Sequence, residues 1–193
     1  MRVFAAFPLP TEVRTTIAEA FKSSRAREPH ARWVNDTIMH LTVHFFGELP
    51  PEAVEGLKSV FDDASLRRPP IRARLGASGQ FPQSGHARVL WVGLEAGGEE
   101  LAEFSRRFEQ RIAGLARLGG PPQAWLPDAR GFTPHITVAR AGRDTIHDMW
   151  AEGLELPHID FIVDECVLFE SLIGVGGSEY HALAAMRFTG GDS

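Results

Sequence analysis

The chain has 193 residues, enough for one compact domain with a substantial hydrophobic core. Its hydrophobic content of 44%, charged content of 23% and formal net charge of −5 are ordinary for a globular protein and argue against a broadly basic polyanion binder. The single cysteine, Cys166, excludes an intrachain disulfide and a cysteine-based zinc cluster, and no apolar run reaches the roughly 18 residues of a membrane span. We therefore expect a single cytoplasmic domain over residues 1–193, with no membrane segment.

The first half of the chain alternates strand patterns with helix patterns. Residues 2–7 predict a strand, and the apolar positions within 13–21 follow helical spacing. A strand pattern over 40–47 comes next, followed by a helix that begins near residue 52 and ends before Pro69.

The second half contains similar elements. We expect, in order, strands at 71–75 and 89–94 joined by a Gly-, Ser- and Pro-rich segment, helices at 99–118 and 144–153, and strands at 159–169 and 180–188 joined by a turn at 174–177. Since each half mixes helices with strands, the order predicts an α+β fold with mainly antiparallel sheets flanked by helices.

One short pattern, His-x-Thr-x with apolar x, occurs twice, as His40-Leu41-Thr42-Val43 and as His135-Ile136-Thr137-Val138. Polar and apolar residues alternate in both copies, which is typical of a half-buried strand. Each histidine then shares a strand face with its threonine, so that both side chains can contact one phosphate. Two histidines brought together in this way would suit acid–base chemistry on a phosphodiester.

The surroundings of the two motifs also repeat. Trp33 precedes the first motif and Trp125 precedes the second, at similar distances. Strict alternation along the first strand places Phe45 in the core and His44 on the open face beside His40.

The segments Arg32-Trp33-Val34, His40 through Glu48 and Phe132 through Arg140 resemble the 2H phosphoesterases. More narrowly, they are similar to the bacterial and archaeal RNA 2',3'-cyclic phosphodiesterases, also called 2'-5' RNA ligases, over essentially the whole chain. The resemblance implies a bilobal fold with pseudo-two-fold symmetry, in which each lobe supplies one motif to a central cleft. It also implies opening of a 2',3'-cyclic phosphate at an RNA end to a 2'-phosphate, without metal or other cofactor. His44 is a departure, because the family often has Arg or Lys there, and so is the pair Leu172-Ile173, which often contains Arg.

The chemistry divides between the two histidines. A water must lose a proton as it attacks phosphorus and the departing ribose oxygen must gain one, which imidazoles with a pKa of about 6.5 can do near neutral pH. By resemblance, His40 is the proton donor and His135 the proton acceptor, although the near symmetry of the motifs leaves that direction open. Thr42 and Thr137 are candidates to bind the phosphate and stabilise its developing charge.

Arg140 follows His135 by five positions, so a regular strand would turn its guanidinium toward the core. A buried, unpaired guanidinium is costly, so we predict that the strand ends or bulges near Ala139 and lets Arg140 reach the phosphate. A surface arginine is the alternative. Phe45 holds the equivalent place after His40 and would offer a hydrophobic or stacking surface.

The remaining candidates have weaker patterns. His44 is a candidate for a peripheral substrate contact, and Trp33 and Trp125 could either stack on a base or pack in the core. Core packing is expected for Trp91. A zinc site built on His40 and His44 lacks both the spacing and the further ligands, so we expect no metal.

The expected partners are RNA with 2',3'-cyclic phosphate ends or cyclic nucleotides, bound by a monomer. Two alternatives remain open at this point. An RNA ligase that joins RNA ends would use the same histidines, and a non-catalytic binder of RNA ends or nucleotides would bind without turnover.

Overall fold

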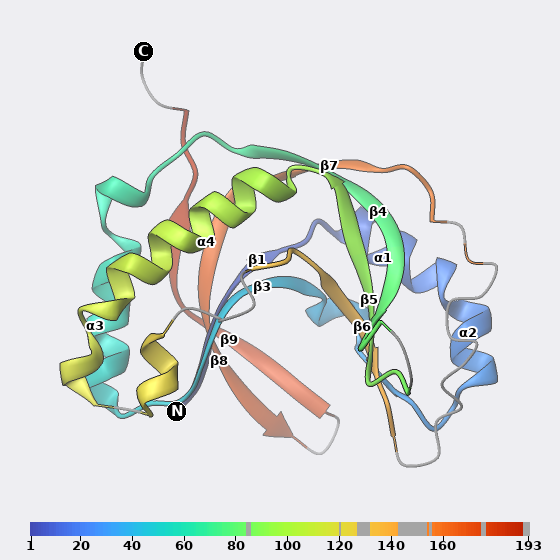
Figure 1. Cartoon of the computed structure of the whole chain (residues 1–193), viewed down its shortest axis with the longest axis horizontal. Helices are drawn as coiled ribbons and strands as arrows, with labels where there is room; N and C mark the ends of the chain where they lie inside the picture. The colour runs from blue at the N-terminus through green and yellow to red at the C-terminus, as the bar shows by residue number, and fades with distance from the viewer. Residues whose placement is uncertain are drawn as a thin grey trace.

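The computed structural model describes residues 1–83, 86–119, 121–126, 132–142, 154, 156–174 and 177–190. Within them, one antiparallel sheet runs through the molecule in the strand order β7-β4-β5-β6-β3-β1-β8-β9, and a short strand β2 pairs with β6 (Figure 1). The strands are β1 (Arg2–Pro8), β2 (Arg32–Trp33), β3 (His40–Glu48), β4 (Ile71–Phe81), β5 (Val89–Ala96), β6 (Ile136–Arg140), β7 (Asp160–Val163), β8 (Glu165–Gly174) and β9 (Gly177–Arg187).

Helices cover the convex side of the curled sheet at its two ends. Figure 1 shows α3 (Pro51–Phe61) and α4 (Gly98–Ala113) together at one end, and α1 (Thr11–Ala20) and α2 (Lys22–Arg27) at the other. None of the helices in the described part of the chain is long and apolar enough to span a membrane.

The strand order has an internal symmetry about its centre. β3 and β6, which carry the two motifs, lie side by side at the centre, and three strands follow outward on each side: β1, β8 and β9 beyond β3, and β5, β4 and β7 beyond β6. A single pair of residues, Leu41 and Ile136, joins the two central strands. The expected α+β fold with two related halves is therefore confirmed.

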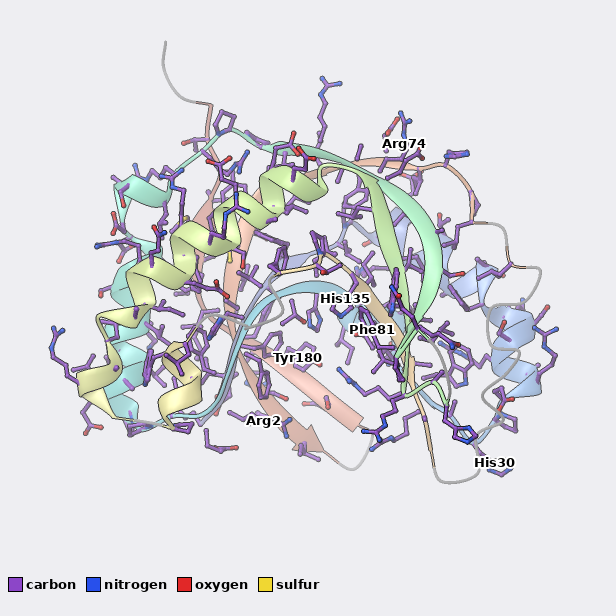
Figure 2. All side chains as sticks on the ribbon, in the orientation of Figure 1. Arg2, His30, Arg74, Phe81, His135 and Tyr180 are labelled. Carbon is purple, nitrogen blue, oxygen red and sulfur yellow. The ribbon has the colours of Figure 1, made fainter. Side chains whose placement is uncertain are left out.

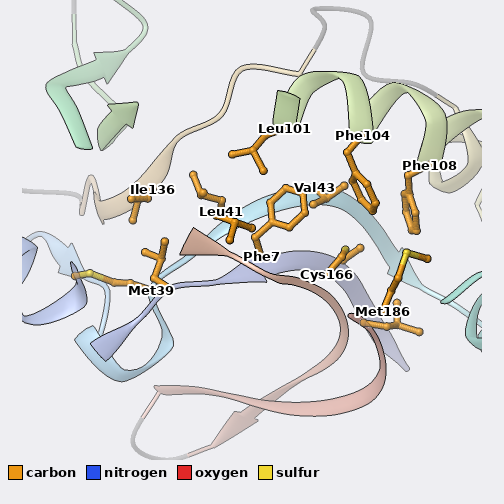
Figure 3. Close-up of a cluster of buried hydrophobic side chains, with 14 of the residues drawn as sticks. Phe7, Met39, Leu41, Val43, Leu101, Phe104, Phe108, Ile136, Cys166 and Met186 are labelled. Carbon is orange, nitrogen blue, oxygen red and sulfur yellow. The ribbon is translucent and has the colours of Figure 1, made fainter. Parts of the chain in front are cut away.

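The hydrophobic core lies between the central strands and α4. Phe7, Leu41 and Val43 contribute from the sheet, and α4 presents residues at helical spacing, among them Leu101, Phe104 and Phe108 (Figure 3). That spacing explains why residues 98–113 form a helix, since one stripe of its surface is covered by the sheet. The core thereby holds both motif strands rigidly from behind.

Cys166 lies in this core and is fully buried. Burial raises the pKa of its thiol, because the thiolate would lose its hydration there. A structural thiol, as the sequence indicates, fits this environment.

Several element boundaries differ from the expected ones. β4 continues to Phe81, through the segment expected to be a loop, and its glycine at position 76 allows the close approach of the Leu94 backbone. The strand expected over 159–169 is divided into β7 and β8 at Asp164.

At the C-terminal end of α4, the helix ends at Ala113, before Gly114, and the chain continues as a 3-10 turn over Ala116–Leu118. The sequence did not predict α2. The helix expected at 144–153 lies outside the described residues, as does the middle of the turn expected at 174–177.

Candidate active site

His40 begins β3, and two contacts hold its imidazole ring. Its Nδ1 lies 2.8 Å from the carbonyl oxygen of Ile38, and its Nε2 lies 3.0 Å from the hydroxyl oxygen of Thr42. A carbonyl oxygen only accepts hydrogen bonds, so the Nδ1 of His40 carries a hydrogen and donates it. The lone pair of the neutral ring is therefore on Nε2, beside Thr42.

His135 immediately precedes β6 and repeats this arrangement. Its Nδ1 lies 2.8 Å from the carbonyl oxygen of Thr133, again two residues earlier in the chain. The ring is packed edge-on against Phe81, with centroids 5.3 Å apart, and lies 6.4 Å from the ring of Trp91. Figure 2 shows His135 and Phe81 side by side on the inner face of the sheet. Both motif histidines are thus fixed in the same tautomer by a backbone carbonyl.

Both motif strands carry an irregularity at the same place, directly after the threonine. On β3, Thr42 pairs with Ala6 and His44 with Ala5, so Val43 is an extra residue. On β6, Thr137 pairs with Trp91 and Ala139 with Leu90, so Val138 is extra in the same way. The side-chain alternation therefore changes phase after both valines.

The phase change corrects the expected orientation of His44 and Phe45. His44 is only 7% exposed, and its Nε2 lies 2.8 Å from the carbonyl oxygen of Ala124. Its Nδ1 is 3.6 Å from a carboxylate oxygen of Glu109 on α4. Phe45, expected in the core, is 49% exposed on the face of His40. The expectation that His44 shares the open face was wrong, because strict alternation does not hold across a bulge.

The same phase change confirms the bulge expected near Ala139. Val138 and Ala139 are both buried, whereas Arg140 is exposed. Arg140 lines a cleft together with His40, Thr42 and Thr137. Its guanidinium is thereby placed on the face that carries the two motifs.

The cleft has a volume of about 490 Å³, within the usual range of ligand sites. Besides the motif residues, its walls include three side chains that the sequence did not single out: Arg2, Phe4 and Tyr180. The Arg2 guanidinium lies 5.1 Å from the centre of the Phe45 ring. No local pattern connects these residues to the motifs, since only the pairing of β1 with β3 and β8, and of β8 with β9, brings them there.

Tyr180 forms one side of the pocket around His40. Its ring centroid is 5.4 Å from that of His40 and 4.8 Å from that of Phe4. Burial raises the pKa of the Tyr180 phenol, against the smaller opposite influence of Arg140 and Arg2. The phenol therefore keeps its proton and can donate a hydrogen bond into the cleft. Tyr180 lines the cleft together with Thr137 of the second motif.

The electrostatic environment of His40 favours its neutral form. Burial lowers the pKa of His40, and the positive charges of Arg140 and of protonated His135 lower it further. The hydrogen bond to Ile38 acts in the opposite direction. A bound phosphate would add a negative charge at the same place and so favour protonation.

The tryptophans occupy three different environments. The indole nitrogen of Trp33 donates to the carbonyl oxygen of Glu28 at 2.8 Å, and its ring lies against Phe21, away from the residues that line the cleft. Trp125 is 2% exposed in the core. Trp91, expected in the core, instead shares the face of Thr137, with its ring 5.1 Å from Phe81.

No group of three or more His, Cys, Asp or Glu side chains that could hold a metal ion is present among the described residues. The polar groups that line the cleft are instead the imidazole of His40 and several hydroxyl and guanidinium groups, which are hydrogen-bond donors suited to an anion.

Comparison with known proteins agrees with this geometry. Residues 9–172 match the family model of the 2'-5' RNA ligase superfamily. A curated relative, the RNA 2',3'-cyclic phosphodiesterase of Thermus thermophilus, is 36% identical over 143 residues, which are 72% of this chain and 68% of that protein. The crystal structure of TT0787 of Thermus thermophilus superposes with a TM-score of 0.77 at 28% identity, with 100% of both chains covered. E. coli LigT complexed with 3'-AMP has a TM-score of 0.70 at 26% identity, covering 97% of this chain and 98% of that one. With paired His-x-Thr strands at the centre of a two-fold sheet and a family match over most of its length, this chain belongs to the 2'-5' RNA ligase superfamily.

Proposed function

We propose that this protein hydrolyses 2',3'-cyclic phosphate ends of RNA to 2'-phosphates, with two histidines as acid and base and no metal cofactor. The observation that carries the proposal is the matched pair of imidazoles: each Nδ1 is bound to a carbonyl two residues earlier, so each ring has its Nε2 left for proton transfer, that of His40 beside the hydroxyl of Thr42. The name of the Thermus relative, RNA 2',3'-cyclic phosphodiesterase, supports the same activity.

The two-fold arrangement suits an in-line displacement at phosphorus. Water attacks on one side of the phosphorus atom while the 3'-oxygen of the ribose leaves on the other, so a base and an acid are needed on opposite sides. The pairing of Leu41 with Ile136 relates the two histidines by a local two-fold axis, which would place the phosphate between them.

We assign His40 as the proton donor and His135 as the proton acceptor. A lowered pKa makes the protonated form of His40 a stronger acid. The negative charge of the bound phosphate would favour this protonated form, which a proton donor needs. His135 would remove the proton of the attacking water through its Nε2.

The phosphate itself would be held by Thr42, Thr137 and Arg140. All three line the cleft with His40, and hydroxyl and guanidinium groups donate to non-bridging phosphate oxygens without needing to rearrange. Phe45, exposed on the same face, would provide an apolar surface for the ribose or base of the terminal nucleotide. Trp33 lies outside the cleft lining and has no such role in the proposal.

The proposal is tested with an oligonucleotide that ends in a 2',3'-cyclic phosphate, in the presence of EDTA. His40→Ala and His135→Ala should each lose nearly all turnover, and the product of the unmodified protein should be the 2'-phosphate. His158→Ala is a matched control, because this exposed histidine contacts Glu95 and lies outside the cleft lining. Normal turnover in either motif variant, or binding without turnover in the unmodified protein, would contradict the proposal.

A second substrate is needed to determine which histidine donates the proton and which accepts it. If sulfur replaces the 3'-oxygen of the cyclic phosphate, the leaving thiolate needs no proton, so the loss of a general acid no longer matters. His40→Ala should then recover most of its activity, whereas His135→Ala should not. The opposite pattern would exchange the two roles.

Ligation of RNA ends is the second candidate, favoured by the family to which the chain belongs. The same two histidines would activate a 5'-hydroxyl in place of water: its oxygen attacks the phosphorus of the cyclic phosphate, the bond to the 3'-oxygen breaks and that oxygen takes up a proton, which leaves a 2'-5' phosphodiester. Product analysis with concentrated RNA ends distinguishes a joined 2'-5' product from hydrolysis alone. We further propose a monomer that acts in the cytoplasm, which light scattering and cell fractionation would test.

A further inference from the structure

Arg32 and Arg140 are direct register partners on the paired strands β2 and β6. Both are exposed. Side chains directly opposite in an antiparallel pair project from the same face with Cβ atoms about 4.5–5.5 Å apart, and like charges in such positions repel each other. Two adjacent guanidiniums in a protein of net charge −5 therefore call for an explanation.

The neighbours of Arg32 show which face it occupies. Val34, two residues further along, lines the cleft, as does Arg140 itself. Trp33, which lies between Arg32 and Val34 in the chain, packs with Ala139 against the core. Alternation along the strand thus turns Arg32 toward the cleft side of the sheet.

The carboxylates of the described residues do not explain the pair. Within the described residues, no ion pair joins Arg32 or Arg140 to an aspartate or glutamate. The one hydrogen bond of the Arg32 side chain in that part of the chain goes to the carbonyl oxygen of Ala141 at 3.3 Å, which leaves further donors of the guanidinium available.

We propose that Arg32 binds a second phosphate, the one on the 5' side of the terminal nucleotide. This inference rests on the proposed function, in which Arg140 and the motif residues hold the cyclic phosphate. A nucleotide bound there would direct its 5' group along the same strand face, toward the guanidinium next to Arg140. The preferred substrates are then 5'-phosphorylated or oligomeric, rather than cyclic mononucleosides.

Three substrates separate a phosphate contact from a contact to the next nucleotide. A nucleoside 2',3'-cyclic phosphate has no 5' phosphate, its 5'-phosphorylated form adds only that group, and a dinucleotide with a cyclic end adds a phosphodiester and a second base. In Arg32→Ala, KM should rise about tenfold for the second and third substrates, the effect of losing one exposed charge-assisted hydrogen bond. Turnover of the first substrate should stay unchanged.

Salt dependence provides an independent measurement. Loss of one phosphate contact should make the slope of log KM against log salt concentration shallower by about 0.7 for the oligomer. Arg32→Lys should retain most of that slope. Arg74→Ala is the matched control. Arg74 is an exposed arginine on β4 that forms an ion pair with Asp160 on β7, and it lies far from His135 in Figure 2.

A failure of the Arg32 inference can be distinguished from a failure of the proposed hydrolysis. Equal losses on all three substrates would show that Arg32 only supports β6 through Ala141, and an effect confined to the dinucleotide would show contact with the second base; either result overturns the inference. Calorimetric binding of a nucleoside 2'-phosphate, with and without a 5' phosphate, needs no turnover. A 5'-phosphate preference that disappears in Arg32→Ala would support the subsite even if hydrolysis were not observed.

Discussion

Leu41 of β3 and Ile136 of β6 are register partners, and each directly follows the histidine of its motif. An antiparallel pair has a local two-fold axis, so this register places His40 across from Thr137 and His135 across from Thr42. The four polar residues therefore share one face, opposite the face on which Leu41 and Ile136 are fully buried. One apolar pair thus sets the geometry of both halves of the site.

The pH profile of Arg140→Gln should identify the role of His40. Arg140 lowers the pKa of His40, so its removal should raise that pKa. If His40 is the acid, activity requires its protonated form, and the high-pH limb of kcat/KM should move to higher pH. Movement of the low-pH limb instead would make His40 the base. Measurement of kcat/KM from pH 5 to 9 on a cyclic-phosphate oligonucleotide distinguishes the two.

Stability should also report the environment of His40. The pKa of this side chain is lowered in the folded protein relative to about 6.5 in the unfolded chain. The unfolded state then binds more protons between those two values, so stability should fall as the pH decreases below about 6.5. His40→Asn should be less sensitive to acid than the unmodified protein in urea unfolding at pH 8 and pH 5.5. An identical pH dependence in both proteins would contradict this prediction, and His158→Asn serves as the control.

His44 should matter for stability rather than for substrate binding. His44→Ala would leave the Ala124 carbonyl and the largely buried Glu109 carboxylate without their partner, at a cost of about 1–3 kcal/mol in unfolding free energy. Because the ring is turned away from the cleft, KM for a cyclic-phosphate substrate should stay near its original value. His44→Gln, which can still donate to Ala124, should recover part of the stability. A large rise in KM with unchanged stability would restore the substrate-contact role.

Position 79 should not tolerate even the small side chain of alanine. A Cβ atom at this position would overlap the ring of Trp91, which lies on the face of the second motif. Gly79→Ala should therefore displace Trp91 beside His135, lowering kcat and costing about 1–3 kcal/mol of stability. Tryptophan fluorescence would report the displacement of Trp91, urea unfolding the loss of stability, and turnover of a cyclic-phosphate oligonucleotide the change in kcat. Gly190→Ala, where no atom lies within 4 Å, should change neither.

Much of the fold could be predicted because its signals are local. The strand at His40, the helix ending at Phe61 and the helix ending at Ala113 follow from periods of about 2 and 3.6 residues in the apolar positions. Boundaries such as the end of β4 were missed, since its Gly- and Ser-rich part resembles a loop and forms a strand only through pairing with β5.

By itself, the sequence determined which residues are the candidates for the chemistry and that each motif histidine stands beside a threonine in a strand pattern, because residue type and alternation are properties of consecutive residues. Only the tertiary structure decided which side chains join them. The bulges at Val43 and Val138 turned His44 inward and Phe45 and Arg140 outward, and strand pairing brought Arg2, Tyr180 and Arg32 to the same face. Register between strands depends on hydrogen bonds between distant parts of the chain, and the lowered pKa of His40 depends on the burial and charge that this register creates.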